Sequence, residues 1–333
     1  MNVERFRLLE KVAVQLTTVA ALMVVYVLLW PALQPVDPLG PVVFLPDGNY
    51  AQMAVFVASL WALAAACAVT TILARPQGAL LAALIGAGAI SLRSSKIHAL
   101  LWIWQGELGG LYCRFILELL LFAAAVVVAA LIVALVRGVL VRAAPKWFWT
   151  DPLAGLADEQ RAGVGHARAG WSWLEIFGGS SATWRLVLSF GKSTSATVKR
   201  RWGREALVRS LACLLLSLAI SILALMILLR STERGQLLLG LLVSFIAAVL
   251  IAHQVFPTPL AIVAWVAPLL AGILFYALAA VSSMSRAPQA WAELAEYAHT
   301  LPIDWLTAGC GGGLIGYWIS SRIHEMQHLQ KNK

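Results

Sequence analysis

The residues near the C-terminus include the pattern His324-Glu325-Met326-Gln327-His328, in which two histidines are four positions apart. On a helix, positions i and i+4 lie on the same face, so that both imidazoles can ligate one zinc ion. The glutamate between them would then lie beside a metal-bound water and take its proton. The pattern therefore predicts, as one alternative, metal-assisted hydrolysis with Glu325 as the catalytic residue and His324 and His328 as zinc ligands.

These five residues resemble the zincin metalloprotease signature, and the resemblance covers no other part of the chain. A third metal ligand would have to come from upstream, where no ligand-type residue has a recognisable spacing. The other interpretation is a polar amphipathic helix, with Ile323, Met326 and Leu329 packed on the membrane surface at i, i+3 and i+6. We expect this second arrangement, with no cofactor and no catalytic site, and zinc remains the alternative.

Charged residues inside apolar stretches can mark ion or substrate pathways. Glu118 lies about one turn inside such a stretch, and Arg114 precedes it by four residues on the same helix face. This spacing predicts an intramembrane ion pair that is neutralised locally at the edge of the membrane. His253, near the end of another apolar stretch, is expected to hydrogen-bond a neighbouring helix or to face water rather than to relay protons.

Small residues are concentrated in two apolar stretches, 303–321 and 78–96, where several of them recur four positions apart. Such residues let helix backbones approach closely where lipid supplies no hydrophobic drive for association. We therefore expect tight helix packing at these positions, either within the bundle or against a partner. The positions are Gly309, Gly312, Gly313, Gly316, Ala83 and Gly86.

The elements that would position these residues follow from the composition. Of the 333 residues, 61% are hydrophobic and only 12% are charged, whereas an average soluble domain has about 25% charged residues. A soluble fold of this size cannot bury so many apolar side chains. We therefore expect an all-α, polytopic transmembrane bundle of about eight spans, each long enough for a hydrocarbon core of about 30 Å. The expected spans are 12–30, 51–74, 78–96, 115–136, 207–229, 237–256, 260–281 and 303–321.

The third expected span ends at two cations, Arg93 and Lys96. Both can reach the membrane interface if the helix ends there, and residues 97–104 would then lie along the membrane surface. One helix continuing to Trp104 would instead bury two charges, at about 2.5–3.5 kcal/mol each. We expect the helix to end at the cations.

In a membrane protein, a net charge of +9 indicates how the chain is oriented in the membrane and that it attracts anionic lipid. We therefore do not expect a nucleic-acid partner. Most lysines and arginines fall on the side of the membrane that holds both termini. The positive-inside rule then places both termini in the cytoplasm, in a bacterial-type inner membrane. The four cysteines are scattered and show no C-x-x-C spacing, so we expect neither a disulfide framework nor a thiolate zinc site.

The longest polar segment, 142–206, interleaves tryptophans with basic residues. This pattern is typical of short amphipathic helices that lie on an anionic leaflet. We expect it to face the cytoplasm and to contact lipid headgroups. The residues expected at this interface are Lys199, Arg200, Arg201, Trp202 and Arg204.

The chain is expected to comprise four spans in 1–141, the basic loop 142–206, and four further spans with a polar tail in 207–333. The two halves show no inverted repeat, which weakens the case for a repeat-built transporter. The leading hypothesis is a non-enzymatic scaffold or accessory subunit of a membrane complex, with other membrane subunits as partners. The alternatives are a transporter or channel for a small or lipid-like solute, and the zinc-dependent membrane hydrolase.

Overall fold

The structure, a computed structural model, describes residues 3–35, 37, 40–72, 74–143, 196–258, 260–284 and 294–331. Of these, the side chains of 3–7, 141–143, 196–206, 284, 325 and 328–331 are not described. Within the described ranges the regular structure is helical, with no strand. The expected all-α membrane class is confirmed.

In the described part of the chain, eight long helices cross the bundle, and shorter helical segments continue or connect them. The long helices are α1 (Val3–Val24), α3 (Tyr50–Thr70), α4 (Pro76–Arg93), α6 (Leu108–Ala143), α10 (Ala196–Leu228), α11 (Arg234–Val255), α12 (Ile262–Met284) and α14 (Cys310–Lys331). The shorter segments are the π-helical η1 (Val25–Leu29), α2 (Trp30–Leu33), α5 (His98–Ile103), the 3-10 helix η4 (Glu296–His299), α13 (Pro302–Asp304) and the π-helical η5 (Trp305–Gly309).

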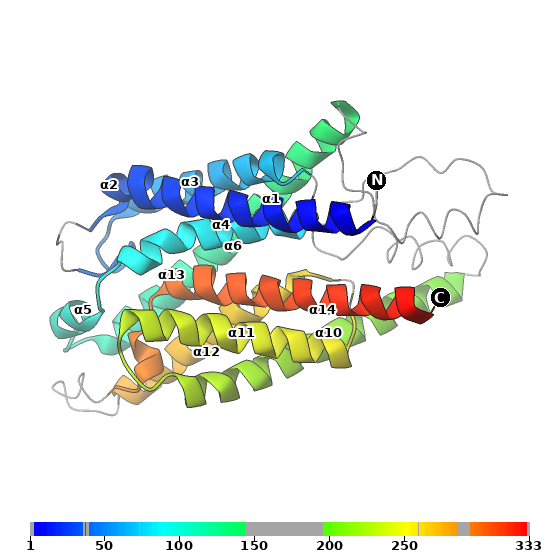
Figure 1. Cartoon of the computed structure of the whole chain (residues 1–333). Helices are drawn as coiled ribbons and strands as arrows, with labels where there is room; N and C mark the ends of the chain where they lie inside the picture. Colours follow the sequence, from blue (N-terminus) through cyan, green and yellow to red (C-terminus); the bar gives the residue numbers. More distant parts are fainter. Residues whose placement is uncertain are drawn as a thin grey trace.

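Both chain termini lie at one end of the bundle, which we call the terminal end, and α5 lies at the opposite, distal end (Figure 1). Successive long helices run in opposite directions between these ends. Helices α1, α3, α4 and α6 form an N-terminal group, and α10, α11, α12 and α14 form a C-terminal group. The two groups join where α6 packs on α12 and where α4 packs on η5 and α14.

Seven of the described helices are long and apolar enough to cross a membrane by length and composition. The expected eighth span, 303–321, is helical throughout, because α13, η5 and α14 form one unbroken helix over 302–331. This helix is less apolar than the seven, and most side chains of its span are buried by neighbouring helices. A helix enclosed by protein needs less apolar surface than one exposed to lipid.

Helix α4 ends at Arg93, as expected, and does not continue to Trp104. The chain then turns into the short helix α5, in which Trp102 is exposed. Lys96 pairs with Glu233 at 2.5 Å between Nζ and Oε1, and both side chains remain well exposed. Arg93 and Lys96, which would have been costly inside the membrane, therefore lie at the end of the helix and just beyond it.

Candidate functional site

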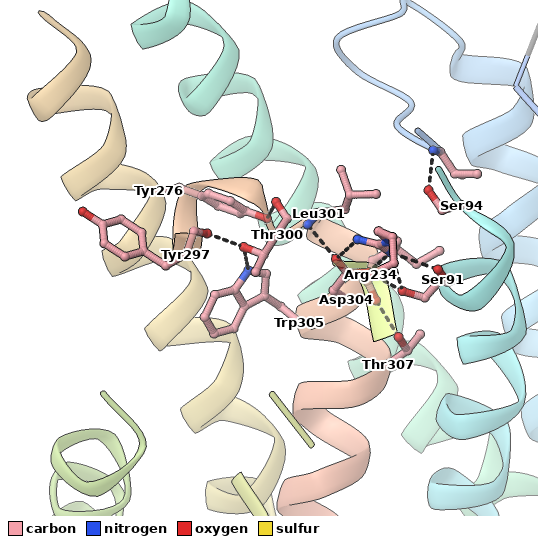
Figure 2. Close-up of polar contacts among 12 residues, drawn as sticks. Ser91, Ser94, Arg234, Tyr276, Tyr297, Thr300, Leu301, Asp304, Trp305 and Thr307 are labelled. Atoms are coloured by element: carbon pink, nitrogen blue, oxygen red, sulfur yellow. Dashed lines mark hydrogen bonds and ion pairs between the residues drawn. The ribbon is translucent and has the colours of Figure 1, made fainter. Parts of the chain in front are cut away.

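The polar contacts of the distal end converge on Asp304, which is fully buried at the start of the helix over 302–331 (Figure 2). Pro302 begins this helix, where the missing N–H of a proline leaves no hydrogen bond unmade. Asp304 is the third helical residue, and its Oδ2 accepts the backbone N–H of Leu301 at 2.8 Å. The sequence Leu301-Pro302-Ile303-Asp304 therefore caps its own helix.

Arg234, the first residue of α11, forms a two-pronged ion pair with Asp304 (Figure 2). Its Nη1 lies 2.6 Å from Oδ2, and its Nη2 lies 2.6 Å from Oδ1. The Arg234 Nη2 also donates to the backbone carbonyl of Ser91 at 2.9 Å, and the Ser91 hydroxyl donates to Asp304 Oδ1. One carboxylate thus ties together α4, α11 and α13.

A second set of contacts anchors the same helix start to α12 (Figure 2). The indole Nε1 of Trp305 donates to Thr300 Oγ1 at 3.0 Å, and the Thr300 hydroxyl donates to the Tyr297 carbonyl at 2.7 Å. The Tyr276 hydroxyl donates to the Thr300 carbonyl at 3.1 Å. The Trp305 ring stacks on Phe275 with centroids 5.8 Å apart. These buried polar atoms have partners, as a rigid interior requires.

The number of hydrogen bonds that the Asp304 carboxylate already accepts decides what this cluster can do chemically. Each carboxylate oxygen already accepts two donors, from Arg234, Ser91 and the Leu301 N–H. A carboxylate offers about four acceptor positions, so little capacity remains for a substrate or a transferable proton. The geometry therefore describes a structural clamp between helices rather than a general acid or base.

The residues expected to form an ion pair, Arg114 and Glu118, both contact the loop between α2 and α3. Glu118 is fully buried, and its Oε2 accepts the backbone N–H groups of Phe44 and Leu45 at 3.1 and 3.0 Å. Arg114 donates to the Pro46 carbonyl at 3.4 Å, and its guanidinium lies 4.5 Å from a ring centroid of Trp104. Within the described part of the chain, no ion pair joins Arg114 to Glu118.

These two contacts have a physical reason. Arg114 lies six residues after the start of α6 at Leu108 and Glu118 lies one turn further along this helix, and both side chains face the loop that folds over the distal end. Buried backbone N–H groups of a loop need acceptors, and a carboxylate is a strong one. The spacing alone did not reveal this competing partner.

At the terminal end, Arg137 of α6 is a buried cation. Its side chain is 1% exposed and donates to the carbonyls of Thr71 and Ala74, the latter at 2.7 Å. Thr71 and Ala74 follow α3, where the last carbonyls of a helix lack partners. A cation at such a helix end is favourable. The signal in the sequence was one arginine inside an otherwise apolar run.

Glu10 and Arg322 form a second buried contact that could not be predicted from the sequence. Glu10 is 1% exposed on α1, and its carboxylate pairs with the guanidinium of Arg322 on α14. The two residues come from the N-terminal and C-terminal groups, and the pair lies at the terminal end. It therefore joins the two groups opposite the distal contact between Lys96 and Glu233.

The histidine motif lies beside His253 of α11. The Nε2 of His253 is 3.0 Å from the Thr258 carbonyl and its Nδ1 is 2.7 Å from Ser320 Oγ, so both ring nitrogens have partners. The Nε2 of His324 lies 3.4 Å from the carbonyl of His253. The backbone of Glu325 and His328 is helical, and their side chains lie outside the described atoms.

Among the described residues, no group of three or more histidine, cysteine, aspartate or glutamate side chains is arranged to hold a metal ion. Among the described histidines, His253 lies beside the motif, with its ring centroid 5.5 Å from that of His324. The contact between its Nδ1 and Ser320 Oγ of α14 matches the expected hydrogen bond to a neighbouring helix. The described geometry around His324 therefore fits helix packing.

The glycines of the C-terminal helix lie against the backbones of α11 and α12. An added Cβ would lie 2.5 Å from the Leu242 carbonyl oxygen at Gly312 and 1.8 Å from the Ala264 oxygen at Gly313. At Gly316 it would lie 2.5 Å from the Ile246 oxygen. Only a residue without a Cβ fits such contacts.

Three further residues named from the sequence also lie in close packing. A Cβ at Gly309 would lie 3.0 Å from Pro268, and one at Gly86 would lie 2.6 Å from the Ala21 side chain. Ala83 is fully buried on α4. The two small-residue stretches therefore lie inside the bundle.

The residues expected at the lipid interface occupy the start of α10. The backbone of Lys199, Arg200, Arg201, Trp202 and Arg204 is helical, and their side chains lie outside the described atoms. Most of the loop 142–206 is likewise outside the described residues. Comparison of the chain with protein-family models, curated proteins and solved structures gives no match.

Proposed function

We propose that this integral membrane protein works as a non-enzymatic scaffold or accessory subunit of a membrane complex. The observation that supports this most is the backbone contact of Gly312, Gly313 and Gly316 with α11 and α12. It fills the middle of the C-terminal group, where a substrate path through that group would have to run. Packed interiors resist deformation, so the group behaves as a rigid body.

The buried charges support the same proposal. Asp304, Arg137 and Glu10 are each at most 1% exposed. Asp304 pairs with Arg234 of α11, Arg137 binds carbonyls of the turn after α3, and Glu10 pairs with Arg322 of α14. Groups that serve as substrate or proton sites keep part of their bonding capacity free for the ligand, whereas each oxygen of Asp304 already accepts two donors. Here the described partners are internal, which is the use expected of structural polar groups in a membrane.

Two helices, α1 and α10, leave most of their surface available for a partner subunit. Only 17% of the membrane-spanning part of α1 and 22% of that of α10 are buried within the protein, against 50% for α11. The exposed side chains of both helices are mainly large and apolar. We propose that a partner subunit packs on one of these two faces and that lipid covers the rest.

Site-specific photo-crosslinking of the full chain in its own membrane tests this proposal. Crosslinkers would replace Leu16 on α1, Leu215 on α10 and, as a control, Leu274 on α12, all of which are exposed. We expect one distinct protein adduct from Leu16 or Leu215 and none from Leu274. Lipid adducts alone at all three positions, with a single chain after purification in mild detergent, would overturn the scaffold proposal.

One observation favours transport of a small or lipid-like solute as a second candidate. The pairs Lys96–Glu233 and Glu10–Arg322 join the two helix groups at opposite ends of the bundle. In alternating access, contacts at opposite ends of two rigid bodies open in turn around a central site. A scaffold keeps both closed.

Spin-label distances separate the two candidates. Labels at the exposed positions Ile103 and Arg230 span the distal end, and labels at Leu8 and Met326 span the terminal end. The exposed Cys113 would be replaced by serine. One distance population at each end supports the scaffold, and two exchanging populations at both ends support the transporter.

We also propose that the protein lies in a bacterial-type inner membrane with both termini in the cytoplasm, on the charge distribution alone. The basic loop would then contact anionic headgroups of the cytoplasmic leaflet. Reporter fusions at Asn49, Gly163, Gln289 and Lys333 test this orientation. We expect cytoplasmic reporters to be active at Gly163 and Lys333 and exported reporters at the other two, and an active exported reporter at Gly163 would contradict it.

A further inference from the structure

The loop between α2 and α3 includes residues 40–49, here called the distal loop, which covers the distal end of the N-terminal group. Its residues 41–46 are all buried. The ring of Phe44 is fully buried and packs against those of Phe56 on α3 and Phe122 on α6, with centroids 5.6 and 6.2 Å apart. The distal loop therefore closes over α6 as part of the packed interior.

Beneath this loop, the two carboxyl oxygens of Glu118 have different surroundings. Oε2 accepts the backbone N–H groups of Phe44 and Leu45. Oε1 has no hydrogen-bond partner among the described residues, and the side chain is fully buried. Glu118 thus differs from Asp304, since one of its oxygens keeps its bonding capacity free. An ionised carboxylate buried in this way costs far more free energy than a neutral carboxyl.

Among the described residues, none forms an ion pair with Glu118. Arg114, one turn earlier on α6, donates instead to the distal loop, and Asp47 of that loop repels a negative charge on Glu118. Helix α3 has no charged side chain. Three other charged or titratable groups lie on elements packed against α6, and each has a partner elsewhere: Tyr276 with the Thr300 carbonyl, Asp304 with Arg234, and Arg93 with the Tyr26 carbonyl.

We propose that Glu118 is a proton-binding site, and that the distal loop closes over it when Oε1 takes up a proton from the water at the distal end. In the neutral carboxyl, Oε1 carries the hydrogen, and Oε2 still accepts the N–H groups of Phe44 and Leu45 as a carbonyl oxygen. A metal ion would need further ligands, and Glu118 belongs to no group of three or more potential metal ligands among the described residues. A proton needs neither ligands nor room.

Closing of the distal loop then takes up one proton, and opening returns it to the water at the distal end. Over the pH interval in which the closed form keeps this proton and the open form has lost it, each unit rise in pH disfavours closing about tenfold. The closed loop is therefore most stable at low pH and loses stability as the pH rises. The inference goes beyond the proposed function and holds for a scaffold and for a transporter alike.

Hydrogen–deuterium exchange of the full chain in lipid nanodiscs, measured by mass spectrometry at a series of pH values, tests this proposal. The readout is the protection of the N–H groups of the distal loop, corrected for the intrinsic pH dependence of exchange. We expect wild-type protection to fall about tenfold per pH unit within that interval. Glu118→Gln keeps an acceptor oxygen and cannot ionise, so its protection should stay constant. The matched control is Glu107→Gln, an exposed glutamate directly before α6, which should behave as the wild type. Wild-type protection that does not change with pH, or a slope that survives in Glu118→Gln, would overturn the proposal.

Asp47→Asn provides a second test that does not require Glu118→Gln to fold. Asp47 is exposed, so its replacement leaves the buried part of the distal loop intact. Removing its negative charge eases the ionisation of Glu118, and the fall in protection should therefore begin at a lower pH than in the wild type. A fall that begins at the same pH or at a higher one would overturn the assignment of the proton to Glu118.

Discussion

Replacing Asp304 with asparagine removes one charge from the distal clamp while keeping the size of the side chain. In the wild type, Arg234 meets both carboxylate oxygens at 2.6 Å, with Asp304 unexposed and Arg234 11% exposed. Removing one partner of a buried ion pair typically costs about 3–5 kcal/mol, because the remaining charge stays buried and unpaired. Arg234 keeps the Ser91 carbonyl and a little exposure, so we expect a loss near the lower limit, about 3 kcal/mol.

The assay is equilibrium unfolding of the full chain in mixed micelles, followed by tryptophan fluorescence. Asp304→Asn, Arg234→Gln and the double variant form a mutant cycle. We expect the double variant to lose less than the sum of the single losses, because it leaves no unpaired charge. The matched control is Lys96→Gln, which breaks the exposed pair with Glu233 and is expected to cost less than about 1 kcal/mol.

Two results would refute this reasoning. If Asp304→Asn destabilises no more than Lys96→Gln, the buried carboxylate does not hold the helix ends together. If the losses of the two single variants simply add in the double variant, Asp304 and Arg234 are not energetically coupled. Under either result, packing of the aromatic residues around Trp305 alone would hold the helix ends together at the distal end.

Three further predictions follow from packing, protonation and the C-terminal motif. Gly313→Ala should lower thermal stability far more than Gly235→Ala, because the new Cβ would lie 1.8 Å from a carbonyl oxygen at Gly313 and meets nothing within 4 Å at Gly235; equal melting temperatures would remove the packing argument. Burial, reinforced by the neighbouring His98 ring, lowers the pKa of His299 from 6.5 to about 4, so the unfolded chain binds a proton first and stability falls as the pH drops through that interval. His299→Gln should flatten that part of the stability curve, and an unchanged slope would contradict the assignment. Metal analysis of the intact protein should give no stoichiometric zinc and no change in His324→Ala, and stoichiometric zinc that this variant loses would favour the hydrolase.

The course of the helices could be predicted from the sequence, because each span is a local pattern. Apolar runs of sufficient length gave the membrane class, and the cations at the end of α4 gave its end at Arg93. The helix over 302–331 contains the expected span 303–321, whose small residues predict close packing within the bundle or against a partner. The structure places those glycines against α11 and α12.

The polar contacts could not be predicted, because their partners are far apart in the sequence. Asp304 lies 70 positions from Arg234 and 213 positions from Ser91. Local spacing favoured a pair between Arg114 and Glu118, but spacing carries no information about a loop whose N–H groups need an acceptor. Without aligned relatives, no covariation between distant positions could add it.

The modest hydropathy of the helix over 302–331 has a consequence for biosynthesis. Segments enter the bilayer from the translocation channel according to their own transfer free energy, and glycine and polar residues make that free energy less favourable. Helices α11 and α12 are apolar enough, by length and composition, to cross a membrane, and the helix over 302–331 does not reach the same hydropathy. We therefore expect its entry to depend on the surface that α11 and α12 present once they are in place, which would couple membrane integration of this segment to tertiary folding.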